Sequence, residues 1–274
     1  MIRKLKRAIG SRFNFLLNKT INGKNFRIPI AGGLGGAMRA EYEPWMLKML
    51  REIELGCEGA FLDVGVNLGQ TLLAAKSIRP DWDYIGFEPN PFCVFYTMKL
   101  IEANDLEPCV VFPFGISNST GAMDLRLNNI TGGEGSIVAG FRGEEEYKRQ
   151  IKVPILGADA LPEELETRRF GLVKVDVEGG ELEVFQALQP LLERDRPVII
   201  TELLPVYDPE TKQGRFRQSR QDQLLAIVQE LGYRIVRLHL DGSRELLEGI
   251  APHGEIRLSN YLFARAEQVE QFAS

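Results

Sequence analysis

The sequence predicts an α/β fold: a mostly parallel sheet of seven strands that ends in an antiparallel hairpin and follows an N-terminal extension. Two observations carry this prediction. From about residue 42 onward, short strands that are apolar on both faces alternate with helices, as in a doubly wound parallel sheet. After residue 230, two strands follow each other with no convincing crossover helix between them. Because parallel neighbours need such a crossover, this ending is typical of an antiparallel sheet edge.

The predicted extension covers residues 1–40. Apolar side chains recur every three or four residues, which predicts a short helix over residues 1–17: Ile2, Leu5, Ile9, Phe13 and Leu16. Residues 20–30 alternate around the pair Asn22-Gly23, which predicts a hairpin. The Gly-rich stretch 32–36 lacks the Lys of a phosphate-binding loop, so we interpret it as a flexible link or lid hinge.

Residues 41–274 form the predicted main domain. Its strands are expected at residues 60–64, 83–88, 110–114, 172–176, 197–202, 233–239 and 260–264. Its helices are expected at residues 43–55, from 70, at 92–104, from 180 and at 221–231. Residues 115–157 are too long for a simple connection, and insertions of this kind are usually functional or disordered. We expect them, together with residues 207–220, to cover a substrate.

Composition indicates an ordinary soluble protein. The chain has 274 residues, of which 44% are hydrophobic and 26% are charged, and no apolar run is long enough to span a bilayer. Its three cysteines are far apart and it has only two histidines, which makes disulfide frameworks and zinc sites unexpected. The N-terminus lacks the apolar stretch of a signal peptide. We therefore expect a cytoplasmic protein with reduced thiols.

Charge is distributed unevenly along the chain. The first forty residues contain nine Lys and Arg and no Asp or Glu, so with a net charge of −5 the remainder carries −14. A basic arm of this kind can dock on its own acidic body, contact a second copy of the chain, or bind an anionic membrane surface or a nucleic acid. The sequence leaves these partners open, with docking or subunit contact expected before membrane contact.

A glycine turn follows the first strand of the main domain. Gly65 permits a tight turn and a close backbone approach, and Gly69 lets the next helix pack near the strand. Asp63, at the end of the strand, would repel the pyrophosphate of a dinucleotide but suits the cationic amino group of a methionine moiety. Asn67 adds a neutral amide at the same place. The turn therefore predicts a nucleoside ligand without a pyrophosphate.

Glu88 ends the second strand, nineteen residues after Gly69. An acidic group at this place can accept hydrogen bonds from two ribose hydroxyls. After the third strand, Gly115, Ile116 and Ser117 are expected to lie beside an adenine ring. Strand, turn, helix, strand and a terminal Glu at this spacing is a strong signal, whereas the glycine turn alone is weak.

Three stretches resemble the signature motifs of the FkbM family of methyltransferases: residues 61–70, 86–91 and 172–182. The resemblance runs from Ala60 to Glu202, with Gly180 where the family more often has Ala. It implies a Rossmann-like class I methyltransferase fold, S-adenosyl-L-methionine as cofactor, and methyl transfer, commonly to a hydroxyl of a sugar, glycan or secondary metabolite. The residues expected to contact the cofactor are Asp63, Gly65, Asn67, Gly69, Gln70, Thr71, Glu88, Pro89, Asn90, Gly115, Ile116, Ser117 and Asp176.

The candidate catalytic residues are Asp176, Glu178, Glu202 and His253. The first three follow strands whose carboxyl ends meet at the edge where ligands bind in open α/β sheets. A carboxylate could take the proton of an acceptor hydroxyl, or a divalent metal bound by the same carboxylates could acidify it. Asp176 could instead only bind the cofactor, and Glu178 could only cap a helix. His253 stands on the loop between the last two strands, where a solvated histidine is the ordinary case.

Two other functions use a similar sequence pattern. A nicotinamide-dependent oxidoreductase is disfavoured by Asp63, by the incomplete Gly-x-Gly-x-x-Gly motif and by the hairpin at the end of the chain. A catalytically silent binding module is disfavoured by the intact set of Asp63, Gly65, Glu88 and Asp176. Methylation of a nucleic acid is not expected, because the body is acidic and lacks interleaved aromatic and basic residues.

Overall fold

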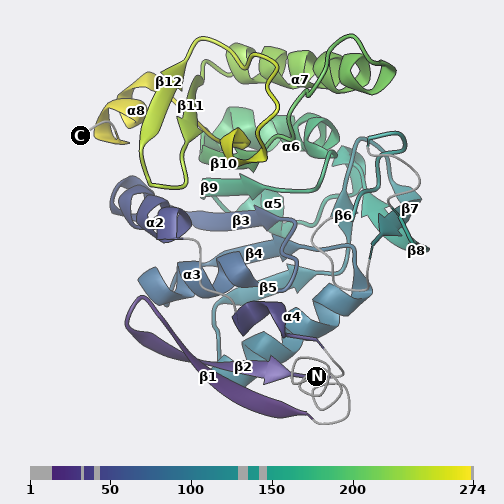
Figure 1. The fold of residues 1–274 in the computed structure, drawn as a ribbon. Helices are drawn as coiled ribbons and strands as arrows, with labels where there is room; N and C mark the ends of the chain where they lie inside the picture. Colours follow the sequence, from purple (N-terminus) through teal and green to yellow (C-terminus); the bar gives the residue numbers. More distant parts are fainter. Residues whose placement is uncertain (1–13, 32–33, 40–43, 129–134, 142–146, 273–274) are drawn as a thin grey trace.

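The computed structural model describes residues 14–31, 34–39, 44–128, 135–141 and 147–272. A sheet in the order β12-β11-β13-β10-β9-β3-β4-β5 forms the centre of the molecule (Figure 1). Its five parallel strands are β3 (Ala60–Val64), β4 (Tyr84–Phe87), β5 (Cys109–Phe112), β9 (Phe170–Val175) and β10 (Val198–Glu202). β3 is buried at every residue, as expected for a strand covered on both faces. The mainly parallel α/β fold is confirmed.

Helices cover both faces of the sheet and enclose two hydrophobic clusters. One cluster includes side chains of α2 (Pro44–Gly56), α3 (Gln70–Ile78) and α4 (Pro91–Asn104). The other includes side chains of α5 (Glu164–Thr167), α6 (Glu181–Asp195) and α7 (Lys212–Glu230). Successive residues of each strand alternate between the clusters, so Ile199 packs in the second and Ile200 in the first.

The C-terminal edge is antiparallel, as predicted, and has one strand more than expected. β13 (Asn260–Ala264) pairs antiparallel with β10, and β11 (Arg234–Leu238) pairs antiparallel with β13. The additional strand, β12 (Arg244–Leu247), pairs with β11 and makes the sheet eight strands wide. α8 (Ala266–Phe272) follows β13.

The predicted hairpin of the N-terminal extension is confirmed. β1 (Phe15–Ile21) pairs with β2 (Lys24–Ile30) around a turn in which Asn22 and Gly23 both have positive φ, the geometry of a type I′ turn. Ile21, Phe26 and Ile28 join the core cluster of α2, α3 and α4, so the hairpin is packed on the main domain. The predicted helix over residues 1–17 is wrong at Phe15–Leu17, which are in β1, and residues 1–13 lie outside the described part of the chain.

The Gly-rich stretch after the hairpin is described only in part. Residues 32–33 lie outside the described part of the chain, while Ala31 and Leu34 exchange backbone hydrogen bonds. Gly35 has φ 85°, and a Cβ there would be 2.1 Å from the carbonyl oxygen of Pro29. This glycine therefore serves close packing. η1 (Ala37–Arg39) follows it.

The long segment after β5 forms a small sheet of its own. β6 (Gly115–Ile116) pairs with β8 (Arg149–Leu156), which pairs antiparallel with β7 (Gly121–Leu127). The second segment expected to cover a substrate, residues 207–220, meets this region: Gln213 Nε2 and Arg217 Nη2 both donate to the carbonyl oxygen of Phe141, at 2.9 and 2.8 Å. Residues 212–220 are helical, because α7 begins nine residues before the predicted start.

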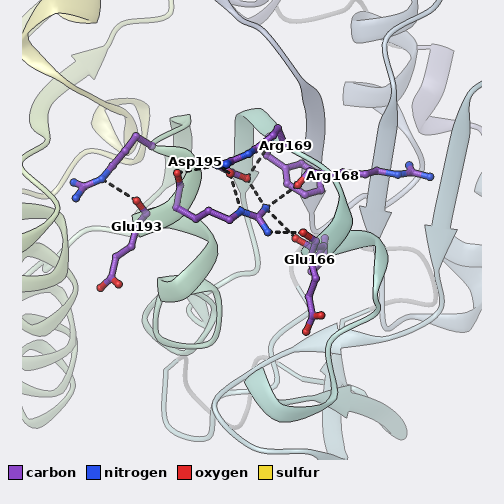
Figure 2. A network of polar contacts seen from close by, with 9 residues as sticks. Glu166, Arg168, Arg169, Glu193 and Asp195 are labelled. Atoms are coloured by element: carbon purple, nitrogen blue, oxygen red, sulfur yellow. Dashed lines mark hydrogen bonds and ion pairs between the residues drawn. The ribbon is translucent and has the colours of Figure 1, made fainter.

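A network of polar contacts lies at the amino end of β9, at the end of the strand opposite the candidate site (Figure 2). The Arg194 guanidinium donates to the carbonyl oxygens of Glu166 and Arg168, each at 2.7 Å. Its neighbour Asp195 accepts from the Arg169 side chain at 2.7 Å and from the Phe170 amide at 3.1 Å. Burial opposes ionisation here, but the hydrogen bonds from Arg194 and Arg169 outweigh it and lower the pKa of Asp195. The network ties the end of α6 to the start of β9.

No helix in the described ranges of the chain is both long enough and apolar enough to cross a membrane.

Candidate functional site

The site lies at the point in the sheet where the order in which strands are added reverses. From β3 the chain adds β4 and β5 on one side, and it later adds β9 on the other side of β3. Such a switch point opens a crevice at the carboxyl ends of the two central strands. There the backbones come very close: Gly65 has φ 95°, and a Cβ at this residue would be 1.9 Å from the carbonyl oxygen of Asp176. Glycine is required at residue 65 for both reasons.

Gly65→Ala is expected to displace the loop after β9 and to weaken nucleoside binding at least ten-fold, about 1.4 kcal/mol. The matched control is Gly232→Ala, because Gly232 also has a positive φ (72°) but a Cβ there would meet nothing within 4 Å. The control should lose only roughly 1–2 kcal/mol of unfolding free energy, the cost of a left-handed backbone conformation at a residue with a side chain. Urea unfolding and ligand titration of both variants check this, and equal effects would contradict the close approach.

Glu88 is a buried carboxylate held by the backbone of two loops. One of its oxygens accepts from the Asn67 amide at 2.7 Å and the other from the Asn90 amide at 2.8 Å. Burial raises the pKa of Glu88 to about 7, against the lowering effect of these two hydrogen bonds. A carboxylate has about four acceptor positions, so two remain for a ligand with neighbouring hydroxyls.

Asp63, Lys174 and Asp176 form a chain of charges across β3 and β9. Lys174 Nζ lies 3.5 Å from Asp63 Oδ1 and 3.3 Å from Asp176 Oδ2, and Tyr84 donates its hydroxyl to Asp63. Burial raises the pKa of Asp63, and the nearby Lys174 and Tyr84 only partly oppose this. Burial alone would lower the pKa of Lys174, but the carboxylates of Asp176 and Asp63 raise it, so the amine stays charged.

A smaller cavity of about 80 Å³ lies between the end of β4 and the small sheet of β6, β7 and β8. Its polar residues are Asn67, Glu88, Asn90, Asp176 and Glu178, and its apolar wall includes Phe87, Pro89, Ile116, Leu125, Leu127 and Ile137. The cavity thus offers a buried carboxylate beside apolar surfaces on both sides. This set of hydrogen-bond acceptors and apolar surfaces fits a ribose that carries a purine ring.

A larger cavity of about 320 Å³ continues from the smaller one. Both cavities share Gly65, Asn67 and Asp176. On the sheet side the larger cavity is lined by Lys174, Ile200, Glu202 and Asn260. The opposite side is formed by residues of β1, η1 and α2: Lys19, Ile21, Ala37, Met38, Trp45 and Met46. Gln70 and Thr71, at the start of α3, complete its wall.

The structure brings most predicted site residues to these cavities. Gln70, Thr71 and Glu202 line the larger cavity, Glu88, Pro89, Asn90, Gly115, Ile116 and Glu178 line the smaller one, and Gly65, Asn67 and Asp176 line both. Asp63, Gly69, Ser117 and His253 line neither. Gly69 shapes the site indirectly: it caps α3 with φ 82°, and a Cβ there would be 2.9 Å from Leu100 Cδ2.

All four were expected to act at the site, with Asp63, Gly69 and Ser117 as cofactor contacts and His253 as a catalytic residue, and the buried Ser117 instead donates its amide to the carbonyl oxygen of Leu156 at 2.9 Å. Asp63 is fully buried, so the described geometry connects it to the cavity only through Lys174 and Asp176. Ring nitrogen Nε2 of His253 lies 3.2 Å from the Tyr261 hydroxyl, and burial lowers the pKa of this histidine. Its side chain therefore contacts β13 and lines neither cavity.

The loop after β9 is braced by a carboxylate next to the predicted ones. Glu181 Oε1 accepts from the amides of Gly179 and Val177, at 3.0 and 3.3 Å, while Glu178 has φ 56°. Burial raises the pKa of Glu181 to about 7. Among the described residues, no group of three or more His, Cys, Asp or Glu is placed to hold a metal ion.

Sequence reasoning missed the residues that close the larger cavity from the N-terminal side. Trp45 falls in a predicted helix, Met38 lies in the predicted extension, and Lys19 counts only as one charge of the basic arm. Their apolar spacing is that of ordinary core residues, and only the packing of the hairpin on α3 and α4 reveals the cavity between them. Asn260, the first residue of β13, carried no local signal either.

Comparison with known proteins identifies the family. Residues 63–235 match the model of the methyltransferase FkbM domain. Among curated proteins, the hexuronic acid methyltransferase AglP of Haloferax volcanii is 29% identical over 150 residues, a region that spans 54% of this chain and only 57% of that protein. Solved structures with a similar arrangement include methyltransferase FkbM from Methylobacillus flagellatus KT (12% identity, 75% of this chain and 43% of that chain, TM-score 0.43). Another is a putative caffeoyl-CoA O-methyltransferase from Staphylococcus aureus (11% identity, 80% and 82%, TM-score 0.45). The match to the family model covers well over half of the chain, which therefore belongs to the FkbM family of methyltransferases.

Proposed function

We propose that the protein uses S-adenosyl-L-methionine to methylate an oxygen atom, a hydroxyl group of a sugar or glycan or, more broadly, of a secondary metabolite. One observation carries the proposal: two cavities of different chemistry meet at Asp176. The smaller one offers a carboxylate and apolar walls for an adenosine, and the larger one offers carboxylates and amides for a hydroxylated acceptor. The hexuronic acid methyltransferase among its relatives supports a sugar acceptor.

In this proposal each residue has a defined task. Glu88 accepts hydrogen bonds from the two ribose hydroxyls, and the apolar wall of Pro89 and Ile116 receives the adenine. The bound cofactor supplies an electrophilic methyl group on a sulfonium. Asp176, at the junction of the cavities, takes the proton of the acceptor hydroxyl, and Lys174 holds the Asp176 carboxylate in place. Holding donor and acceptor close together accounts for much of such catalysis.

The basic N-terminal arm has no assigned partner in this proposal. Contact of residues 1–13 with a membrane surface or a second copy of the chain stays a prediction, because these residues lie outside the described part. No nucleic acid is expected to bind. Of the alternatives, family membership argues against an oxidoreductase. The silent binding module is tested below by cofactor binding and turnover.

The test is a calorimetric titration with S-adenosylhomocysteine at pH 6 and pH 8. Ribose hydroxyls that donate to Glu88 favour its ionised form, and with a pKa of about 7 only about a tenth of the Glu88 side chains are ionised at pH 6. We therefore expect the affinity to rise about ten-fold between pH 6 and pH 8. Micromolar binding, followed by release of S-adenosylhomocysteine from the methyl donor with sugar acceptors, would support the whole proposal.

Glu88→Gln is the matched control for this titration. It keeps an acceptor oxygen but cannot ionise, so its affinity should be lower at pH 8 and nearly independent of pH. Glu181, whose pKa is also about 7, is present in both proteins, so the difference between them belongs to Glu88. If the wild-type protein binds neither S-adenosylmethionine nor S-adenosylhomocysteine at either pH, the proposed function is wrong.

A further inference from the structure

The larger cavity has two sides of opposite chemistry. Its polar side includes Glu202, at the carboxyl end of β10, and Asn260, the first residue of β13, and its opposite side is mainly apolar, with Met38, Trp45 and Met46 beside Lys19. These apolar residues precede the region that matches the family model, which begins at residue 63. A part of this chain that lies outside the match to the family model therefore forms one wall of the cavity.

The strand register places the polar groups on one face of the sheet. Glu202 is the direct cross-strand partner of Asn260. Side chains of directly opposed residues project from the same face with Cβ atoms about 4.5–5.5 Å apart. Ile200, two residues before Glu202, packs in the cluster of α2 and α3, so this face is the one that Trp45 covers. A carboxylate and a carboxamide thus lie side by side beneath the apolar wall.

Such a pair suits a particular kind of ligand. A carboxylate accepts hydrogen bonds, and a carboxamide both donates and accepts, so together they can bind two neighbouring hydroxyls. An alkyl chain offers neither a donor nor an acceptor to either side chain. A flat aromatic alcohol has two apolar faces, and one of these faces would lie against the Glu202 carboxylate.

Trp45 supplies the second observation. Its side chain is 5% exposed, and its indole Nε1 is buried without a hydrogen-bond partner among the described residues. A buried N–H group of this kind usually has an acceptor. Trp45 lines the cavity, while its Nε1 is closed off from it, so what the side chain offers to a ligand there is apolar surface on which a C–H face can pack.

We propose that the larger cavity binds one pyranose ring of the acceptor, with the apolar C–H face of the sugar against Trp45 and Met38 and its hydroxyl edge on Glu202 and Asn260. This inference rests on the proposed function and specifies its acceptor site. Trp45 and Asn260 are specificity residues in this arrangement, and both lie outside the region that matches the family model. The pyranose can belong to a free glycoside, a nucleotide sugar or a longer glycan.

Tryptophan fluorescence tests this directly, because the chain has only two tryptophans, Trp45 and the fully buried Trp82. Protein saturated with S-adenosylhomocysteine is titrated with methyl hexopyranosides, methyl hexopyranosiduronates and a UDP-hexose. A saturable change of emission is expected in wild type and in Trp82→Phe, and its loss in Trp45→Phe. Preference for the UDP-hexose over the simple glycosides would identify the nucleotide sugar as the source.

Variants of the polar side separate sugar recognition from general packing. Glu202→Gln and Asn260→Ala leave Trp45 in place and are expected to raise the apparent Kd for the glycoside about three- to ten-fold, the loss of one hydrogen bond. Their affinity for S-adenosylhomocysteine should change by less than two-fold. Glu230→Gln, an exposed residue at the end of α7, is the matched control and should change neither.

The outcomes keep this inference distinct from the proposed function. If S-adenosylhomocysteine does not bind to wild type, the proposed function fails before the acceptor is tested. If it binds but no pyranoside changes the emission, or if catechol or butanol saturates the signal independently of Glu202 and Asn260, the pyranose site is wrong. If Trp45→Phe does not fold, as judged by circular dichroism, the glycoside affinities of Glu202→Gln and Asn260→Ala still test the pyranose site.

Discussion

Asp176→Asn is expected to lower the rate of methyl transfer by about 100- to 10,000-fold, the usual contribution of a general base. Asp176 lines both cavities and is held by Lys174 at 3.3 Å, so it is the carboxylate at the point where donor and acceptor would meet. Asparagine keeps the size of the side chain and can still accept a hydrogen bond from Lys174. Affinity for S-adenosylhomocysteine should therefore change by no more than about three-fold, a shift of under 1 kcal/mol.

Single-turnover measurements with saturating cofactor give this rate without interference from product release. Asp124→Asn is the matched control, because Asp124 is paired with Lys152 on the small sheet of β6, β7 and β8 and lines neither cavity. It should react like wild type. If Asp176→Asn keeps its rate while Glu202→Gln loses it, the proton acceptor is Glu202, and the role proposed for Asp176 is contradicted.

The parts of the fold that depend on short-range patterns could be predicted from the sequence. β3, the glycine turn and the Asn22-Gly23 hairpin all follow local rules of strand burial and backbone conformation, and each was found where expected. The start of α7 could not be found this way, because residues 212–220 are mostly polar and include Gly214. Contacts to distant parts of the chain support this turn of helix, among them the bonds from Gln213 and Arg217 to Phe141.

The candidate site was predictable where it follows the carboxyl ends of the strands. Gly65, Glu88 and Asp176 lie together because parallel strands end at one edge. The role of Asp63 was less predictable, because the alternation of the strand turns its side chain toward Tyr84 and Lys174. The apolar wall around Trp45 depends on how the N-terminal hairpin packs, and no spacing within residues 14–46 distinguishes a cavity wall from ordinary core.

Lys174→Met is expected to lower the free energy of unfolding by about 3–5 kcal/mol at pH 8, the cost of removing one partner of a buried ion pair. Lys174 lies between Asp63, which is fully buried, and the partly exposed Asp176. Methionine has nearly the same length and no charge, so the loss comes from leaving the Asp63 carboxylate without its cation. The double variant Lys174→Met, Asp63→Asn removes that charge as well and should recover most of the stability, which urea unfolding of all three proteins can measure.

The pH dependence of the single variant separates charge from packing. The pKa of Asp63 is already raised in the folded protein, so the native state holds this proton more tightly than the unfolded chain does. The protein therefore loses stability as the pH rises from the pKa of Asp63 in the unfolded chain to its higher pKa in the folded protein. Without Lys174 the pKa of Asp63 in the folded protein rises further, so the pH range over which stability is lost becomes wider. Unfolding free energies measured between pH 5 and pH 8 should therefore decline more steeply in Lys174→Met than in wild type. In the double variant this additional slope disappears. A loss of stability that is the same at every pH, and that Asp63→Asn does not recover, would mean that Lys174 matters for its packing and not for its charge.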